Sequence, residues 1–296
     1  MLRIALEIAD RIVNALPARV VYAGADLAGD AWRRFSPDRR RLVAANLARV
    51  CAATGRPTRG PAFTALVRDA FRNHARYYAE LLRAPHYDRD ALPQIVAVPD
   101  WDTYEAVLRA GPTIIVSSHL GNFEPVAALL ATRGLPPMAP VEEIEPRELF
   151  EFITARRGGG GAEFVPLRNA RSALSRRLRE GGLVGVLGDR LIGGGAGIPI
   201  MLFGHLATIP IGPATLAVTS GVSVIVGSCL RTGPDRFEAS GDVVALPDSG
   251  DRRADIEALT RRLAERFEHD IGRAPEQWWG AFQPFWTDLP DVHGDG

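Results

Sequence analysis

A short segment, "SSHLGNFEP" at residues 117–125, contains residue types that can carry out acid–base chemistry. His119 follows the apolar run "TIIVSS", a pattern that predicts a buried strand ending just before the histidine. Ligands of an open α/β sheet bind at the carboxyl ends of its strands, so we expect the imidazole to face a cleft. An imidazole with an ordinary pKa of about 6.5 can serve as a general base at neutral pH.

Glu124 lies five residues after His119. In a continuous helix the two side chains would point about 140° apart, so they can meet only if the chain turns between them. Gly121 and Asn122 are suitable turn residues. A carboxylate beside the imidazole would fix its tautomer and stabilise the imidazolium that forms. The same spacing also fits a buried capping histidine followed by a glutamate in the first turn of a helix, so the pair alone assigns no function.

The sequence offers no protein nucleophile next to the histidine. Ser117 and Ser118 lie in or beside the strand without a G-x-S-x-G elbow, so we expect His119 to activate a hydroxyl of the substrate. A metal site is not expected, because there is no H-E-x-x-H motif and no third ligand at a recognisable spacing. No cofactor is predicted.

Composition narrows the class of protein. The chain has 296 residues with 46% hydrophobic and 24% charged residues, which is typical of a globular protein. The net charge of zero argues against nucleic-acid binding. Cys51 and Cys229 cannot form a disulfide framework and fit a reducing compartment. No apolar run reaches the roughly 20 residues of a spanning helix, and charges interrupt any signal-peptide core in the first 16 residues.

The pattern along the chain predicts an α/β fold with a mostly parallel or mixed central sheet flanked by helices. Residues 1–95 are expected to form a helical, membrane-associating N-terminal section, and residues 96–296 the α/β domain, with the two parts continuous as one structural unit. In the second part, strand-like runs such as "TIIVSS", "EFVPL", "LVGVLGD" and "VSVIVGSCL" alternate with helical ones. The run "IPIMLF" is also strand-like, and "ADIEALTRRLAERFEHDI" predicts a long amphipathic helix. His74, on a helical face of the first section, is expected in the core.

The N-terminal segment leaves two interpretations open. Apolar residues recur at helical spacing from residue 2 to 13, either against the core or in a membrane interface. "WRRFSPDRRRL" follows, with Trp32, Phe35 and five arginines between Arg33 and Arg41. Aromatic residues beside arginines suit an anionic membrane surface, and a solvated helix end is the alternative.

Five motifs in order are similar to one family. "RNHARYYAELLRAP" resembles a family helix, "HLGNFE" matches a His-x₄-Asp/Glu motif, and "GDR" stands where the family carries an acidic residue. "LFGHLATIPIGPATLAVTSGV" and "PEQWWGAFQPFW" resemble two further blocks. The chain thus resembles the bacterial lipid A biosynthesis (lauroyl and myristoyl) acyltransferase family, most closely its phosphatidylinositol mannoside acyltransferase branch.

The resemblance implies catalytic roles. His119 would deprotonate an acceptor hydroxyl, which would attack the thioester of an acyl-CoA or an acyl-carrier protein. Glu124 would orient His119. Asp189 would be a second carboxylate partner of the imidazole, with an N-cap or an ion pair to Arg190 as its alternative role. No metal or cofactor would be needed, because base activation and oxyanion stabilisation suffice.

The resemblance also implies substrate contacts. Arg157 matches a family arginine that could hold a phosphate or headgroup, with Arg156 as the competing candidate. Arg190, Asn122 and Ser118 complete the expected substrate-binding set. The Gly-rich "LIGGGAG" and the apolar pair Met201-Leu202 depart from the family pattern, which leaves the acceptor pocket open. Trp278 and Trp279 are expected to anchor the core.

The implied protein is an acyltransferase peripheral to the cytoplasmic face of the cell membrane. Its expected partners are an acyl thioester, an anionic membrane surface and a glycolipid acceptor, foremost a phosphatidylinositol mannoside. A lipid A precursor, another glycolipid or a lysophospholipid is the alternative acceptor. An acyl-thioester hydrolase that uses the same histidine and glutamate, and a lipid-binding protein without turnover, are the other classes.

Overall fold

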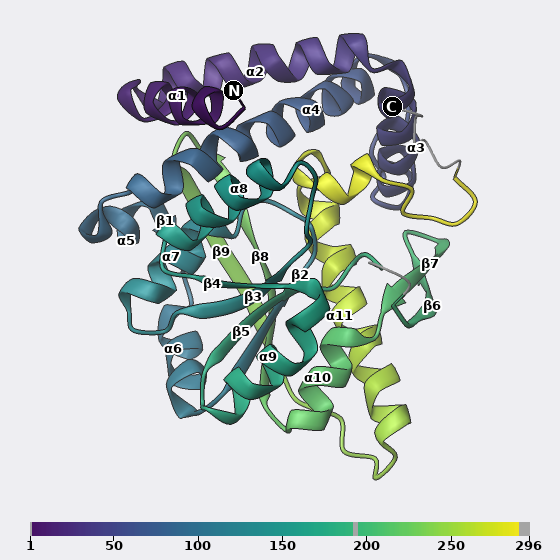
Figure 1. The fold of residues 1–296 in the computed structure, drawn as a ribbon. Coiled ribbons are helices and arrows are strands. Elements are labelled where there is room, and N and C mark those ends of the chain that lie inside the picture. Colours follow the sequence, from purple (N-terminus) through teal and green to yellow (C-terminus); the bar gives the residue numbers. More distant parts are fainter. Residues whose placement is uncertain (1, 192–194, 290–296) are drawn as a thin grey trace.

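The computed structural model describes residues 2–191 and 195–289, which form an α/β fold with an N-terminal helical section (Figure 1). The helices are α1 Leu2–Ala15, α2 Ala18–Phe35, α3 Pro37–Ala53, α4 Gly60–Arg83, α5 Leu92–Ile95, α6 Trp101–Ala110, α7 Glu124–Thr132, α8 Arg147–Gly159, α9 Leu167–Arg179, α10 Gly212–Ser220 and α11 Arg252–Arg273. The strands are β1 Val96–Ala97, β2 Thr113–Ser117, β3 Pro137–Val141, β4 Glu163–Pro166, β5 Leu183–Leu187, β6 Gly197–Leu202, β7 His205–Pro210, β8 Ser223–Gly233 and β9 Arg236–Val244. The fold class is the predicted one.

The central sheet has seven strands in the order β1-β9-β8-β2-β5-β3-β4. β2 lies inside the sheet with parallel neighbours, β5 and β8, on its two sides. β8 and β9 form an antiparallel pair, and the other neighbours are parallel. The carboxyl ends of β2 and β5 therefore open at the same edge of the sheet, and the segments that follow these two strands lie next to each other.

Both faces of the sheet are covered, which explains why the three middle residues of β2 are apolar. Ile114 and Val116 point into the core under α9, α10 and α11. Ile115 packs on the opposite side, with Tyr104 and Leu108 of α6. Because successive side chains of a strand alternate between faces, a strand buried on both sides has no polar position to spare. The continuous run "TIIVSS" is the sequence signature of this burial.

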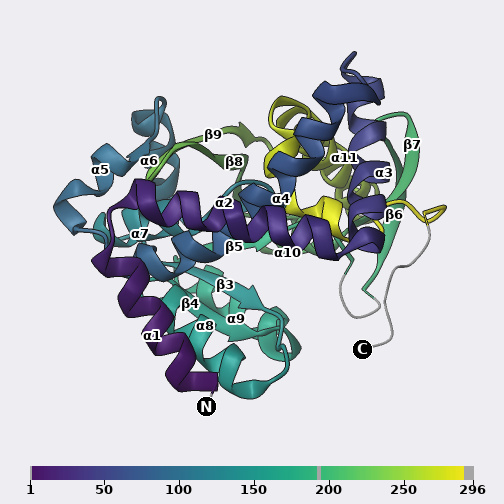
Figure 2. The same cartoon turned by 90° about the horizontal axis from the view of Figure 1, so that it is seen from above.

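The N-terminal helices share their core with the sheet. Val43 of α3 and Phe71 of α4 belong to the same buried cluster as Ile114 of β2. Figure 2 shows α2 lying along α4, with α1 running beside α8. α2 and α4 approach so closely that a Cβ at Gly29 would lie 2.7 Å from the Cα of Arg72. The helical section therefore covers the sheet domain by direct packing.

Two features differ from the sequence-based expectation. The run "IPIMLF" forms β6, which pairs with β7 in a separate two-stranded sheet instead of joining the central one. The alternating segment of β9 was not predicted as a strand; it pairs with β8 over nearly its whole length. Residues 192–194 of the Gly-rich segment lie outside the described residues. Over the residues that are described, the helices are all too short or too polar to cross a membrane.

Trp32 is partly buried and packs against the core, so less of its ring is available to a membrane surface than the sequence suggested. Its ring centroid lies 5.0 Å from that of Phe71 and 5.0 Å from that of Phe282. His74 contacts the same cluster, with its ring centroid 4.4 Å from that of Phe282. Trp32 thus anchors α2 to the core, while its neighbour Phe35 is 79% exposed.

The burial of His74 makes stability sensitive to acid. Desolvation lowers the pKa of its imidazole to about 4, and the positive charge of Arg39 adds to the shift. Between about pH 6.5 and about pH 4 the unfolded chain binds a proton that the folded chain does not, so stability falls as the pH falls, by up to about 1.4 kcal/mol per unit. We expect urea unfolding to show a smaller loss over this window for His74→Phe than for the wild type. Parallel losses in the two proteins would contradict this role of His74.

Candidate active site

The strand register brings His119 and Asp189 together. β2 and β5 are parallel neighbours in which Ser117 lies opposite Leu187. His119 and Asp189 each lie two residues beyond these strand ends. Their side chains meet with His119 Nδ1 2.5 Å from Asp189 Oδ1. Because an ionised carboxylate can only accept hydrogen bonds, Nδ1 carries the proton and Nε2 is the basic nitrogen.

The surroundings of Asp189 keep it ionised. Its side chain is buried, and the indole Nε1 of Trp278 donates to its second oxygen at 3.2 Å. Burial alone would raise the pKa of this carboxyl, but the charge and hydrogen bonds of His119, with that of Trp278, outweigh burial and hold the pKa below its usual range. Gly280 leaves room for the indole, since a Cβ there would lie 2.4 Å from Trp278 Nε1. The imidazole therefore faces a permanent negative charge.

The turn after His119 depends on a glycine. Gly121 has a φ of +71°, and a Cβ at this position would lie 2.0 Å from the carbonyl oxygen of Cys229 in β8. Its N–H donates to the carbonyl of Gln277 at 3.0 Å, and the N–H of Asn122 donates to the carbonyl of Cys229 at 2.8 Å. The turn is thus fixed between β8 and the C-terminal segment, and a side chain at Gly121 would push it away from both.

Glu124 does not orient His119, contrary to the expectation from the resemblance. Its carboxylate pairs with Arg157 of α8, with Arg157 Nε 2.6 Å from Glu124 Oε1. The Glu124 side chain is 6% exposed and that of Arg157 19%. The reason is geometric: Glu124 begins α7, and the helix directs it toward α8, whereas Asp189 follows a strand adjacent to β2. Asp189 is the carboxylate that contacts the imidazole.

Two residues of the expected substrate-binding set hold the turn instead. Asn122 is completely buried, with its Nδ2 donating to Glu80 at 2.7 Å and its Oδ1 accepting from the N–H of Glu124 at 3.0 Å. Ser118 is 1% exposed. Both side chains are buried in this conformation, so a contact of either one with a substrate stays a prediction.

The three arginines considered as headgroup contacts each pair with a carboxylate of the chain itself. Arg157 forms an ion pair with Glu124, and its guanidinium lies 4.4 Å from the ring centroid of Phe164. Arg156, the competing candidate, pairs with Asp10 of α1 at 2.9 Å. Arg190 pairs with Glu142 at 2.9 Å and is 25% exposed. A contact between Arg157 or Arg190 and a headgroup stays a prediction.

Sequence reasoning missed Trp278 as a partner of Asp189 and missed Glu80 altogether. Trp278 was expected only as a core anchor, and it is indeed 1% exposed. Glu80 is a fully buried glutamate on α4, and the available signal was its place next to the apolar face of a helix. The signal that favoured Asp189 over Glu124 was also present, since "TIIVSSH" and "LVGVLGD" place both residues at the same distance after a strand.

An apolar cavity lies next to the turn. It has a volume of about 90 Å³ and lies between the sheet and the helices α6 and α7. Ser117, the last residue of β2, and Phe123, just before α7, lie at the end near the turn. The cavity is continued by Ile115, Trp101, Leu108, Val126, Leu130 and Ile225. A linear hydrocarbon chain is the kind of ligand that such walls accept.

The fold and the site define an α/β enzyme with a histidine–carboxylate pair just past the ends of β2 and β5 and an apolar cavity beside the turn that follows β2. The chain belongs to the bacterial lipid A biosynthesis acyltransferase family, whose sequence profile matches residues 4–286, and it is an acyltransferase. The resemblance read from the five motifs is confirmed.

Individual relatives span nearly the whole chain. It is similar to the phosphatidylinositol mannoside acyltransferase of Mycolicibacterium smegmatis, with 29% identity over 294 residues, which is 95% of this chain and 90% of that protein. The phosphatidylinositol mannoside acyltransferase of Mycobacterium tuberculosis is 27% identical over 289 residues, 94% of this chain and 87% of its own.

Replacing Glu124 should destabilise the fold. Glu124→Gln leaves the Arg157 guanidinium partly buried without its charge partner, which we expect to cost about 3 kcal/mol of unfolding free energy. Glu151→Gln is the matched control, because Glu151 pairs with Arg147 on the surface, with 54% and 85% of the two side chains exposed. That change should cost less than about 1 kcal/mol. Chemical denaturation measures both, and equal small losses would show that the Glu124 pair is not a structural tie.

Proposed function

We propose that this acyltransferase moves a fatty acyl chain from a thioester, acyl-CoA or acyl-carrier protein, to a glycolipid hydroxyl, with a mannosylated phosphatidylinositol as the acceptor. The observation that carries the proposal is the contact of 2.5 Å between His119 and Asp189 at the end of β2. The choice of acceptor is supported by the two mycobacterial relatives, whose names give phosphatidylinositol mannoside as their substrate and whose identity of 27–29% extends over most of the chain.

His119 acts as the general base. Nε2 takes the proton of the acceptor hydroxyl while the hydroxyl oxygen attacks the thioester carbonyl carbon, and the resulting imidazolium is stabilised by Asp189. The tetrahedral intermediate then collapses, the carbon–sulfur bond breaks, and the thiol leaves with the proton from Nε2. The products are the acylated lipid and the free thiol. The proton taken from the acceptor balances the one that the thiolate requires.

The apolar cavity receives the acyl chain in this proposal. It begins at Ser117 and Phe123, which flank the turn of His119, so a chain inside it has its thioester end near the imidazole. Burying the chain is favourable by roughly 0.8 kcal/mol per methylene group. The volume of about 90 Å³ is less than a long acyl chain needs, so the side chains of α6 and α7 have to move apart for longer chains.

Docking on a membrane is the second part of the proposal. An enzyme that extracted its lipid substrates into water would expose their acyl chains at a cost of about 0.8 kcal/mol per methylene group. Ile4, Ile8 and Ile12 recur every four residues on α1 and are 62%, 51% and 53% exposed. α1 runs beside α8, which carries Arg157. An apolar stripe on α1 that enters the interface would therefore hold the site close to the lipid.

The arginines between Arg33 and Arg41 contribute less to membrane binding in this proposal than the sequence suggested. Arg39 donates to the carbonyl of Phe282 at 2.5 Å, and Arg41 pairs with Asp38. We therefore assign membrane binding chiefly to the stripe on α1 and to Phe35, with the protein peripheral to the cytoplasmic face, where acyl thioesters are available.

Loss of His119 should remove catalysis. His119→Ala should lower kcat by about 10²–10⁴-fold, the usual contribution of a general base. Asp189→Asn should also lower kcat by at least about tenfold, because an amide can turn its NH₂ toward Nδ1 and favour the wrong tautomer. The assay is mass spectrometry of acylated phosphatidylinositol mannoside formed from palmitoyl-CoA, with His269→Ala, an exposed histidine on α11, as the control.

Two results would overturn this proposal. Turnover of folded His119→Ala within twofold of the wild type would exclude the base. Release of free fatty acid from palmitoyl-CoA at the same rate with and without lipid would identify a hydrolase instead.

Removing the stripe on α1 should release the protein from membranes. Changing Ile4, Ile8 and Ile12 to glutamine should lower the fraction that sediments with phosphatidylglycerol–phosphatidylcholine vesicles by at least about fivefold, because the apolar area entering the interface is lost. The control changes Met201, Leu206 and Val243, which are 58%, 55% and 44% exposed on other elements, to glutamine. Equal sedimentation of the two triple variants would contradict docking through α1.

A further inference from the structure

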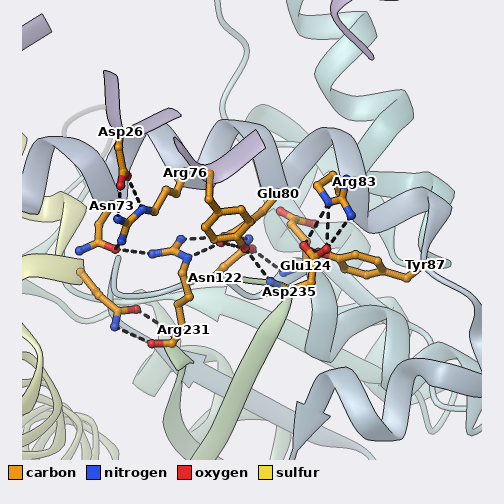
Figure 3. A network of polar contacts seen from close by, with 12 residues as sticks. Asp26, Asn73, Arg76, Glu80, Arg83, Tyr87, Asn122, Glu124, Arg231 and Asp235 are labelled. Atoms are coloured by element: carbon orange, nitrogen blue, oxygen red, sulfur yellow. Dashed lines mark hydrogen bonds and ion pairs between the residues drawn. The ribbon is translucent and has the colours of Figure 1, made fainter. Parts of the chain in front are cut away.

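Glu80 of α4 is a buried carboxylate surrounded by donors from three other parts of the chain (Figure 3). The hydroxyl of Tyr22 in α2 donates to it at 2.6 Å, and Asn122 Nδ2 donates at 2.7 Å. Arg231 of β8 donates through both Nε and Nη2, the latter at 2.7 Å. All four contacts are donors, so Glu80 serves as an ionised acceptor.

A gain in folding stability does not explain why the Glu80 carboxylate is buried. A buried ion pair pays a desolvation cost that its attraction only roughly repays, and apolar replacement of both partners is often neutral or stabilising. Glu80 holds the pKa of Arg231 above its usual range even though burial would lower it. The proposed reaction does not use either group. The remaining distinctive contact of Glu80 is therefore the one to Asn122, which lies inside the turn after His119.

Glu80 determines which way the Asn122 amide faces. An acceptor-only group attracts the NH₂ end, which leaves Oδ1 to accept the N–H of Glu124, the first residue of α7, at 3.0 Å. With the opposite orientation the amide would present a donor to that N–H, and the start of α7 would lose its side-chain acceptor. The orientation of one amide thus joins the turn to α4 and to the start of α7.

Arg231 fixes the other side of the turn. Its N–H and carbonyl form two hydrogen bonds with the side chain of Gln277, at 2.8 and 3.0 Å. The carbonyl of Gln277 in turn accepts the N–H of Gly121 at 3.0 Å. Glu80 therefore acts on the turn by two routes, directly through Asn122 and through the position of Arg231.

We propose that Glu80 is a positioning residue for catalysis, which holds the Asn122 amide and thereby the turn that aims His119 at the acceptor hydroxyl. This inference rests on the proposed role of His119. A misplacement of about 1 Å at a reacting group can cost about 10²-fold in rate, so a turn that is free to shift would lower kcat. Most of the cavity wall belongs to the sheet, α6 and α7, so KM for the thioester should change much less.

Two matched double variants separate positioning from charge. Glu80→Gln with Arg231→Met and Glu80→Leu with Arg231→Met both remove the buried ion pair, but only the glutamine offers an acceptor to Asn122. We expect the leucine variant to lose kcat by about 10- to 100-fold, with KM for palmitoyl-CoA within threefold of the wild type. The glutamine variant should keep kcat within about threefold. Thermal unfolding of both variants checks that each is folded at the temperature at which kcat is measured.

The inference is overturned if the two double variants have equal kcat, whether both are active or both are impaired, because the acceptor for Asn122 then makes no difference. Should the leucine variant not fold, Asn122→Ala supplies the same test with Glu80 and Arg231 intact, and wild-type kcat overturns the inference. Asp30→Asn is the control, since Asp30 ties α2 to Arg72 of α4 at 2.6 Å and has no contact with the network around Glu80 among the described residues.

The parallel measurement of His119→Ala separates this inference from the proposed function. Wild-type turnover in His119→Ala refutes the function itself. A large loss in His119→Ala together with equal double variants refutes only the role of Glu80.

Discussion

The parallel register of β2 and β5 is the constraint on which the site depends. Ser117 and Leu187 are paired at the ends of the two strands, so the residues two positions further on leave the sheet side by side. This places an imidazole nitrogen 2.5 Å from a carboxylate oxygen without any contribution from a flexible loop. A shift of one residue in the register would point every side chain of a strand to the other face, so the site requires that β2 and β5 keep this register.

Three buried pairs that each contain a carboxylate surround one short turn. His119 with Asp189, Arg157 with Glu124, and Arg231 with Glu80 all lie within or against the segment from 119 to 124. Each pair loses hydration when it is buried. Trp278 donates a further hydrogen bond to Asp189, and Asn122 and Tyr22 donate to Glu80. Such an arrangement contributes little net stability, but it excludes conformations in which a charge is left alone, and the turn therefore has one well-defined conformation.

The N-terminal helices have two roles in this arrangement. On their inner side, α2 and α4 supply Tyr22 and Glu80 to the polar network behind the turn (Figure 3). On its outer side, α1 leaves isoleucines exposed that a water-facing helix would replace by polar residues. The same helical section thus connects the catalytic turn with the surface that we assign to the membrane, and its packing against the sheet makes the two parts one hydrophobic core.

The sequence by itself determined the α/β class, the strand that ends at His119, the family and the long last helix, because these depend on local apolar periodicity and on motifs whose residues are close in the chain. It also showed that Gly121 and Asn122 form a turn. It did not decide which carboxylate contacts His119, nor that Trp32 packs against Phe71, nor that Glu80 contacts Asn122. Those contacts join residues about 40 to 90 positions apart, and they exist only because β2 pairs with β5 and α4 crosses the end of the sheet. A motif fixes spacing along the chain, whereas the direction of a side chain past a strand end is set by the neighbouring strand, which only the tertiary structure supplies.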